Sequence, residues 1–344
     1  MSQVSPAKLK VPAINQVAIC VHDLEQVSWN FWNILGMGPW EIYDWEFPLI
    51  NERKYWGKRE WGRDRISLFR AGKLQVELVQ PVEGKSLYKD WLEQKGEGLH
   101  HFNFLVDDIK PVQAAMEEIG FPCIQTGYYG FTPGKRTTFS YHETTPALRI
   151  LWEPVALGGQ KTVKPLWVPA TADPPSPAKF QVKAINQVGM VVKNLEETCW
   201  NYWNLLGIGP WEVYSRTYPY FYDRKYHGKT TYSKERVAVA RAGEVLFEMV
   251  QPLEGKSADL DFLNQHGEVL HYLNVPVDDL DTAAATLTEM GYPSIQSARF
   301  GKPQDKSGFS YHYIPALRAI FRVEHAGGVK GVPSTWIPGP PTSA

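Results

Sequence analysis

The sequence predicts an α+β protein made of four strand–helix–strand–strand–strand modules, arranged as two tandem domains. Two observations lead to this prediction. Segments of the first half return in the second half, so that Ile14-Asn-Gln-Val reappears 171 positions later as Ile185-Asn-Gln-Val. Within each half, alternating apolar and polar residues are followed by residues with the 3.6-residue period of a helix. A repeat of this length indicates two copies of one fold.

The repeat also sets the expected domain boundaries. Trp29 opens the segment WNFWNILGMGPWEIY, and Trp200 opens its counterpart WNYWNLLGIGPWEVY. A Pro-rich stretch between the copies is typical of a linker. We therefore predict a first domain over residues 5–170, a linker over 171–177 and a second domain over 178–338.

Each element of the first half follows from its pattern. Val17, Ile19 and Val21 alternate with other residues and predict a strand with one apolar face. Asp23 is a suitable cap for the next helix, and Gly36 ends it. The same pattern restarts near residue 101. In order, we predict strands 16–21, 40–43, 65–70 and 75–80 with a helix over 24–35, a short helix over 87–94, and then strand 101–106, a helix over 109–119 and strands 137–142 and 148–153.

Composition narrows the classes of function. The 344 residues carry 36 Lys and Arg against 37 Asp and Glu, so the basic excess typical of nucleic-acid binding is missing. No apolar run reaches the roughly 20 residues of a membrane span, and the N-terminus lacks the apolar core of a signal peptide. Three widely spaced cysteines do not suit a disulfide framework or a zinc knuckle. We expect a cytoplasmic protein with a small-molecule partner, neither nucleic acid nor membrane, and a homodimer is left open.

Several motifs resemble those of one known superfamily. INQVAICVHDLEQ and FWNILG resemble the opening of vicinal-oxygen-chelate proteins, the glyoxalase and bleomycin-resistance superfamily. GLHHFNFLVDDI is similar to the second-module opening of methylmalonyl-CoA epimerase-like members, and VELVQP and ILWEP are similar to their metal-bearing strand ends. The resemblance covers nearly the whole chain twice. It implies paired βαβββ modules with curled mixed sheets around clefts, and it leaves the reaction open.

The resemblance implies a metal site in the first cleft. The matching positions are Gln16, Glu77, His101 and Glu153. Their oxygen and nitrogen donors suit a divalent ion such as Zn, Mn, Co, Fe or Mg. Gln16 stands where the family pattern usually has His, and an amide is the weaker ligand, so a cleft without metal stays an alternative. His100 is expected on the opposite face of its strand, as a structural hydrogen-bonding residue.

The second cleft is expected to be degenerate. Its matching positions are Gln187, Glu248, Tyr272 and Arg322. A phenol and a guanidinium are poor ligands for a dication, and Arg keeps its positive charge. We expect Arg322 to neutralise Glu248. Dioxygenases of this superfamily with four modules carry a His, His, Glu iron site in their C-terminal half. The C-terminal half of this chain lacks both His and the aligned Glu of that site, so the resemblance also disfavours iron-dependent ring cleavage.

Candidate acid/base residues follow from the same strands. Glu153 is the first candidate base, His142 is a second candidate acid/base, and Tyr141 is a candidate hydrogen-bond donor. The base of the epimerase-like pattern aligns here with Ser67, and with Ala238 in the second half. Neither side chain can serve as a base at neutral pH.

Aromatic residues indicate the kind of ligand. Aromatic residues make up 13% of the chain, and Trp is concentrated in the first half. Trp45, Tyr55, Trp56 and Trp61 lie in loop-rich sequence and suit a flat ligand, and Lys54 is a candidate contact for an acidic or phenolic group. We expect a hydrophobic, oxygenated, aromatic small molecule.

Three functions are compatible with these residues. The first is a metal-assisted isomerase, epimerase or racemase that transfers a proton next to a carbonyl group. A metal-dependent lyase begins with the same proton abstraction and is the first alternative. A binding protein without catalysis, which sequesters a flat ligand, is the second.

Overall fold

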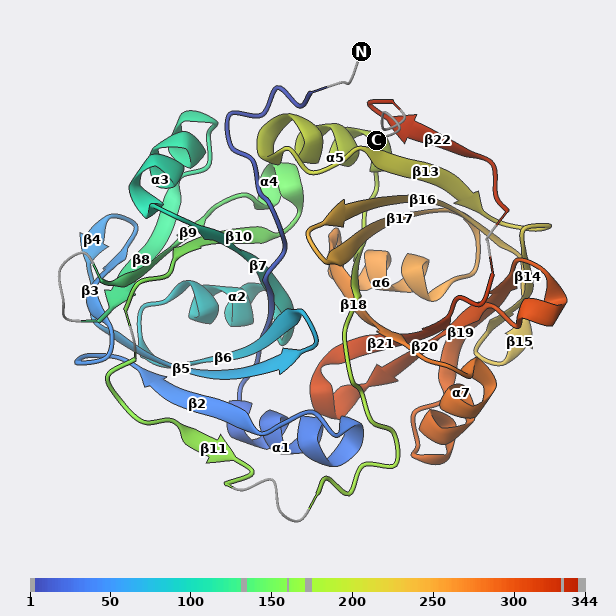
Figure 1. Cartoon of the computed structure of the whole chain (residues 1–344), viewed down its shortest axis with the longest axis horizontal. Helices are drawn as coiled ribbons and strands as arrows, with labels where there is room; N and C mark the ends of the chain where they lie inside the picture. The colour runs from blue at the N-terminus through green and yellow to red at the C-terminus, as the bar shows by residue number, and fades with distance from the viewer. Residues whose placement is uncertain (1–3, 131–134, 160, 171–174, 329–330, 340–344) are drawn as a thin grey trace. The chain divides into compact units, whose positions relative to one another are not determined.

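The computed structural model of the chain describes residues 4–130, 135–159, 161–170, 175–328 and 331–339 (Figure 1). It divides into two compact units. One unit comprises residues 11–181. The other starts at Val182 and includes the N-terminal segment up to Lys10. Each unit is built on its own 11-stranded mixed sheet, so the predicted α+β class and the tandem arrangement are confirmed.

The first unit has the predicted alternation of strands and helices. Its elements are β1 (Gln16–Cys20), α1 (Leu24–Leu35), β2 (Trp40–Trp45), β3 (Asn51–Tyr55), β4 (Lys58–Arg59), β5 (Gly62–Ala71), β6 (Leu74–Gly84), α2 (Leu87–Lys95), β7 (Gly98–Val106), α3 (Ile109–Glu118), β8 (Cys123–Tyr129), β9 (Thr137–His142), α4 (Thr145–Leu148), β10 (Leu151–Ala156) and β11 (Leu166–Val168).

Helix α1 shows how local sequence sets an element. Asp23 is its N-cap and accepts a hydrogen bond from the backbone N–H of Gln26 at 3.0 Å. The helix ends at Gly36, whose φ of 67° is a left-handed conformation that glycine adopts without strain. Apart from Ser28, the buried side chains between these two caps are apolar. In the helix predicted over 109–119 the cap is Asp108, which accepts from the N–H of Lys110 at 3.0 Å.

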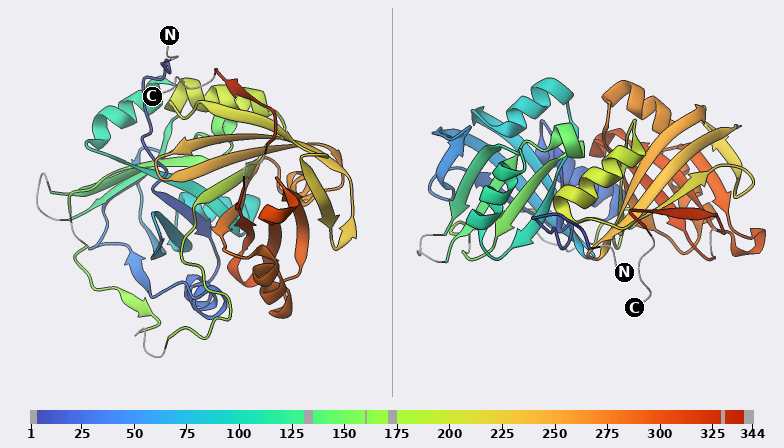
Figure 2. Two further views of the ribbon diagram at one scale, coloured as in Figure 1. Left: turned by 45° about the vertical axis from the view of Figure 1, so that its right-hand side comes forward. Right: turned by 90° about the horizontal axis from the view of Figure 1, so that it is seen from above.

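The sheet of the first unit runs β11-β2-β5-β6-β1-β7-β10-β9-β8-β3-β4. β1 pairs in parallel with β6 and antiparallel with β7, and β10 pairs in parallel with β7. The four predicted ligand-bearing strands are therefore the four central strands of the sheet. In Figures 1 and 2, α2 lies at one end of the curled sheet, whereas α1 and α3 lie outside it.

A β-bulge interrupts the pairing of β1 with β7. Ala18 faces His101 and Ile19 faces Leu99, so His100 is an extra residue in β7. Such a bulge bends the strand and removes the simple alternation of side chains. The prediction that His100 points away from His101 is therefore wrong, because that prediction assumed a regular strand.

The last predicted strand of this half begins later than expected. Residues 145–148 form the short helix α4, and β10 starts at Leu151. Pro146 lies in the first turn of α4, and Arg149 after it has a φ of 63°, which is not an extended conformation. Strands β3, β4, β8 and β11 were not predicted.

The second unit repeats the same order of elements. They are β12 (Gln187–Val191), α5 (Leu195–Asn201), the π-helix η1 (Tyr202–Leu206), β13 (Trp211–Arg216), β14 (Phe221–Tyr226), β15 (Lys229–Thr230), β16 (Ser233–Ala242), β17 (Val245–Gly255), α6 (Ala258–His266), β18 (Val269–Pro276), α7 (Leu280–Glu289), β19 (Ser294–Phe300), η2 (Pro303–Asp305), β20 (Gly308–Ile314), η3 (Pro315–Leu317), β21 (Ala319–His325) and β22 (Ser334–Ile337).

Its sheet has the order of the first sheet, strand for strand, and the same bulge, here at His271 in β18. In the described part of both units, none of the helices is long and apolar enough to cross a membrane.

The leading segment of each repeat packs outside the predicted boundaries. In the C-terminal unit, Ser5 Oγ donates a hydrogen bond to the carbonyl of Trp203. In the N-terminal unit, Ser176 Oγ donates to the carbonyl of Trp32. The contacts within the chain thus divide the two units near residues 10 and 181.

Candidate functional site

A cavity of about 300 Å³ opens on the sheet of the N-terminal unit. It contains three of the four predicted ligand positions, Gln16, Glu77 and Glu153, together with Trp45 and Tyr141. Its remaining lining residues are Asn15, Ile66, Leu68, Arg70, Gln75, Tyr88, Asn103, Leu105, Tyr129, Thr137, Phe139, Val155, Leu157 and Lys161.

His101 is fully buried directly against the two carboxylates of this cavity. Its Nε2 lies 3.2 Å from Glu77 Oε2 and 3.5 Å from Glu153 Oε2. The strand pairing causes this convergence, because Ala18 of β1 faces both Glu77 on one side and His101 on the other. Glu153 is held by a neighbour of His101, since Asn103 Nδ2 donates to Glu153 Oε2 at 2.9 Å.

The donor set fits a divalent cation. Glu77 Oε2 and His101 Nε2 are buried and make no hydrogen bond to the described residues. Two ligands at about 2.1 Å from one ion lie about 3.0–3.5 Å apart, which matches the spacing between His101 and the carboxylates. Among the described residues, no group of three His, Cys, Asp or Glu side chains forms a preformed cage around one point. Binding an ion therefore requires these side chains to move slightly.

Burial and charge act in opposite directions on the ionisable groups here. Burial alone would lower the pKa of His101, but Glu153 and Glu77 outweigh it and raise the pKa to about 9. Burial raises the pKa of Glu77 above its ordinary value, although His101 opposes the rise. The positive charge of the His101 imidazolium thus offsets the negative charge of the two carboxylates. A bound metal cation would offset the same charge.

His100 is the immediate hydrogen-bonding partner of His101. The bulge brings their Nδ1 atoms to 2.7 Å. Burial lowers the pKa of His100 well below its ordinary value, so His100 is neutral and its Nδ1 can accept the proton of His101 Nδ1. This hydrogen bond leaves the Nε2 of His101 directed at Glu77 and Glu153, the arrangement in which a ligating histidine is oriented by a second group.

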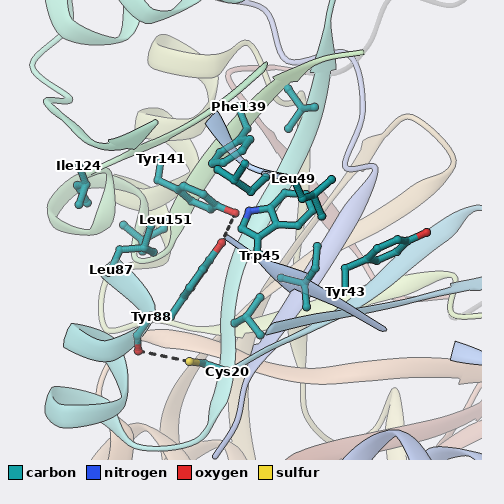
Figure 3. Close-up of a cluster of buried hydrophobic side chains, with 14 residues drawn as sticks. Cys20, Tyr43, Trp45, Leu49, Leu87, Tyr88, Ile124, Phe139, Tyr141 and Leu151 are labelled. Atoms are coloured by element: carbon teal, nitrogen blue, oxygen red, sulfur yellow. Dashed lines mark hydrogen bonds between the residues drawn. The ribbon is translucent and has the colours of Figure 1, made fainter. Parts of the chain in front are cut away.

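Aromatic side chains, among them Trp45, Phe139, Tyr141 and Tyr88, form one wall of the cavity. Figure 3 shows these four side chains gathered in one buried cluster. The Trp45 ring centroid lies 5.9 Å from that of Phe139 and 5.5 Å from that of Tyr129. The hydroxyl groups of Tyr88 and Tyr141 are 2.6 Å apart. Burial raises the pKa of both tyrosines well above the usual range, so both remain protonated hydrogen-bonding groups.

The structure does not bring His142 to the cavity. Its Nδ1 lies 2.9 Å from the carbonyl oxygen of Phe121 and its Nε2 lies 3.1 Å from Ser140 Oγ. In β9, Phe139 and Tyr141 face the cavity, and strand alternation places His142 on the other side. Burial also lowers the pKa of His142. The candidate acid/base role of His142 is therefore not supported by its position.

Four of the five predicted substrate-contacting residues also lie elsewhere. Lys54, Tyr55, Trp56 and Trp61 belong to the β3–β4 hairpin or the turn after it, and none lines the cavity. Tyr55 donates a hydrogen bond to Asp90, while Trp56 and Trp61 are 49% and 57% exposed. Their place in loop-rich sequence thus does not bring these four side chains to the cavity. Only Trp45, on β2, faces the cavity.

The strand that should carry the family's base has a different register. Ser67 faces α1, where its hydroxyl lies 2.9 Å from that of Ser28. Its neighbours Ile66 and Leu68 face the cavity instead. The conclusion that β5 offers no base therefore stays, although the aligned residue was wrong by one position.

Several lining residues were missed in the sequence. Asn103 follows His101 by two positions, so strand alternation alone places it on the same face. Lys161 follows the Gly158-Gly159 pair, and the repeat has Lys330 after Gly327-Gly328. Tyr88 gave no such signal, because it comes from helix α2 and reaches the cavity only through tertiary packing.

The matching place in the C-terminal unit is filled by two arginines. Arg322 lies 3.0 Å from Glu248, and Arg216 lies 3.3 Å from the same oxygen. Arg216 occupies the position of Trp45 in the repeat, and it also pairs with Asp259 at 3.2 Å. Gln187 Nε2 donates to Glu248 at 2.7 Å. The predicted pairing of Arg322 with Glu248 is present.

The family model of the Glyoxalase/Bleomycin resistance protein/Dioxygenase superfamily matches residues 15–139 and 186–311. The chain belongs to this superfamily. Both matches fall on the two repeats, one in each unit. The membership agrees with the resemblance seen in the sequence.

Known proteins similar to this chain include a shorter relative and two solved structures. YqjC of Bacillus subtilis (strain 168), an uncharacterized protein, is 32% identical over 142 residues, which is 41% of this chain and 91% of YqjC. A triple mutant of 4-hydroxymandelate synthase from Streptomyces coelicolor aligns with a TM-score of 0.59 at 14% identity, over 94% of this chain and 95% of that chain. The Mn(II)-bound glyoxalase from Novosphingobium aromaticivorans aligns with a TM-score of 0.47 at 11% identity, over 93% and 83% of the two chains.

Proposed function

We propose that the N-terminal unit is a metal-assisted isomerase, epimerase or racemase that moves a proton next to a carbonyl of a hydrophobic, aromatic small molecule. The observation that carries this proposal is that the carboxylates of Glu77 and Glu153 both lie within 3.5 Å of His101 Nε2 at an aromatic-lined cavity. Gln16, Glu77, His101 and Glu153 are the residues that would hold the ion. A bound dication supplies Lewis-acid polarisation of the substrate carbonyl.

The remaining steps belong to side chains of the cavity. Glu153 would hold the ion through Oε2, the oxygen beside His101, and its other oxygen is the base that takes the proton from the carbon next to the carbonyl. Asn103 fixes the orientation of the carboxylate through the 2.9 Å hydrogen bond to Oε2. Tyr141, which stays protonated and is paired with Tyr88, is the hydrogen-bond donor to a substrate oxygen. The aromatic wall binds the flat part of the substrate and excludes water.

A metal count tests the ligand set. Protein prepared in metal-supplemented medium should contain about one dication per chain by elemental analysis, and Glu77→Gln should remove it. The matched variant Glu248→Gln changes the same position of the other repeat and should leave the metal content as it was. A protein without metal, or loss of metal only in Glu248→Gln, would contradict the proposal.

Hydrogen exchange tests the chemistry. In heavy water the metal-loaded protein should speed the exchange of the hydrogens next to the carbonyl of flavanone or phenylacetone, as followed by NMR. Glu153→Gln should abolish this acceleration. A lyase shares the exchange but also yields two products, which the same spectra reveal.

A second candidate is a binding protein without catalysis. The observation that favours it is the apolar face of β5. Ile66 and Leu68 line the cavity there, so this strand supplies no base. Ligand binding without any acceleration of exchange, in protein that carries metal, would favour this candidate over the isomerase.

A further inference from the structure

Lys161 is a cation at the cavity that the proposed chemistry does not use. It lies five residues beyond the end of β10, and its Nζ stands 4.5 Å from the centroid of the Tyr43 ring and 5.9 Å from that of Tyr129. No ion pair joins it to a carboxylate in the described part of the chain, and it lines the same cavity as Glu77 and Glu153. A lysine between aromatic rings at a cavity wall is a ready partner for an anion.

The charges of the cavity set the sign of its ligand. Glu77 and Glu153 contribute two carboxylates, which face the imidazolium of His101, and Lys161 and Arg70 contribute two positive charges. A dication held by Glu77 and Glu153 neutralises those two carboxylates. The two cations then remain, so a ligand with a negative group at this wall is favoured over a neutral one.

The surroundings of Lys161 increase the effect of such a group. Burial lowers the pKa of its ammonium, while Glu41 and Glu77 act in the opposite direction. Partial removal from water strengthens a charge-assisted hydrogen bond to an anion. Arg70 differs, since it is exposed and donates to the carbonyl of Lys73 at 3.1 Å.

We infer that the cavity takes a flat, carboxylate-bearing molecule whose carboxylate pairs with Lys161 while its ring packs against Trp45, Tyr129 and Phe139. The reacting carbonyl then faces Glu77 and Glu153. This inference rests on the proposed function for the orientation of the substrate, whereas the carboxylate contact itself depends only on Lys161 and the aromatic wall. The competing role for Lys161 is that of an internal counterion to Glu77, with no contact to a ligand.

Binding of two probes of one shape separates these roles. Phenylacetate and its neutral isostere phenylacetamide are titrated into the full-length protein, with and without added Mn²⁺, and binding is followed by calorimetry. The wild-type protein should prefer phenylacetate about tenfold or more. Lys161→Met should remove this preference, and Lys161→Arg, which keeps the charge, should retain most of it. Lys164→Met, an exposed lysine three residues away that does not line the cavity, is the matched control and should behave as wild type.

The outcomes distinguish this inference from the proposed function. Loss of the preference in Lys161→Met but not in Lys164→Met supports the carboxylate site, even if the protein holds no metal and the isomerase proposal fails. An equal affinity of the wild-type protein for the two probes overturns the inference, as does an unchanged preference in Lys161→Met. Loss of metal from Lys161→Met together with an unchanged preference would show that Lys161 serves Glu77 alone.

Discussion

At the scale of single residues, the same position of the repeat carries Glu153 in the first copy and Arg322 in the second, so its charge is reversed. In the N-terminal unit, Glu153 is the second carboxylate of the cavity, so that two carboxylates face one histidine. In the C-terminal unit, the guanidinium of Arg322 lies beside Glu248 and also donates to Asn274 at 2.7 Å. A guanidinium thus provides the positive charge inside the protein that the first unit would obtain from an ion. The aromatic face of Tyr272 covers it at 4.5 Å.

This pairing predicts a large effect of Arg322 on stability. Arg322→Met leaves Glu248 buried with less compensation, and the free energy of unfolding of the C-terminal unit should fall by about 3 kcal/mol. Hydrogen exchange in β17 and β21 under increasing urea measures it. Adding Glu248→Gln should recover more than half of the loss, because the carboxylate that lost one of its two guanidinium partners is gone. A loss below about 1 kcal/mol in the single variant would show that the guanidinium is dispensable.

A second buried carboxyl group should make stability depend on pH. Asp64 is paired with Arg53 at 2.8 Å, yet burial raises its pKa to about 6. The folded protein therefore binds this proton more tightly than the unfolded chain does. The stability that the proton contributes is present below about pH 4 and is lost as the pH rises through 6.

Asp64→Asn cannot titrate and should remove this dependence. Between pH 4 and pH 7, its free energy of unfolding should improve relative to wild type by up to about 3 kcal/mol, as measured by urea denaturation. The exposed carboxyl of Asp107 is the control, and Asp107→Asn should show no such trend. A constant difference between Asp64→Asn and wild type at both pH values would be incompatible with a raised pKa.

At the scale of elements, the bulge in β7 decides the geometry of the candidate site. It places an extra residue, His100, opposite the junction of Ala18 and Ile19. Consecutive side chains, which a regular strand sends to opposite faces, here come within hydrogen-bonding distance. The C-terminal unit keeps the bulge at His271, which contacts Asp259 at 3.3 Å in place of a second histidine. Both units thus have the bulge. The hydrogen-bonding partner of the histidine at the bulge differs, being His101 in the first unit and Asp259 in the second.

The leading segments are the second feature at this scale. Ser5 and Ser176 make the same pair of hydrogen bonds, each accepting from the N–H two residues on at 3.1 Å and donating to a carbonyl of a helix. One bond goes to a carbonyl within η1 and the other to a carbonyl in the last turn of α1. The carbonyl of Trp32 also accepts from the N–H of Gly36 at 3.1 Å, so Ser176 supplies it with a second donor.

At the scale of the whole molecule, each repeat is completed by a segment that precedes the other repeat in the sequence. The segment that precedes the first repeat belongs to the C-terminal unit, and the segment that precedes the second belongs to the N-terminal unit. YqjC matches this chain over 142 residues, fewer than the 171 positions that separate the two copies of Ile-Asn-Gln-Val.

Deletion of residues 1–10 should therefore destabilise the unit farther along the chain. The C-terminal unit loses the hydrogen bond from Ser5 and the burial of Ala7 and Leu9, so its unfolding temperature should fall by several degrees. Hydrogen exchange should quicken in residues 202–211, while α1 keeps its protection. Faster exchange in α1 instead would contradict the assignment of residues 1–10 to the C-terminal unit.

The sequence by itself determined the duplication, the α+β class and the four strands that carry the candidate ligands. These follow from local signals, namely repeated motifs, side-chain period and capping residues such as Asp23 and Gly36. It also indicated the charge inversion at Arg322, because aligned repeats expose a change of residue type directly. The residues on β1, β6, β7 and β10 then converge wherever the strands pair.

Only the tertiary structure decided which other side chains face the cavity. His142 and Trp61 have the right chemistry but lie outside it, whereas Lys161 reaches it from the connection between β10 and β11 and Tyr88 from helix α2. A bulge or a one-residue shift of register, as at His100 and Ser67, reverses the face on which a side chain lies, and no local pattern records it. The composition and motifs therefore predict which groups a cleft can use, and the packing of strands against α2 selects among them.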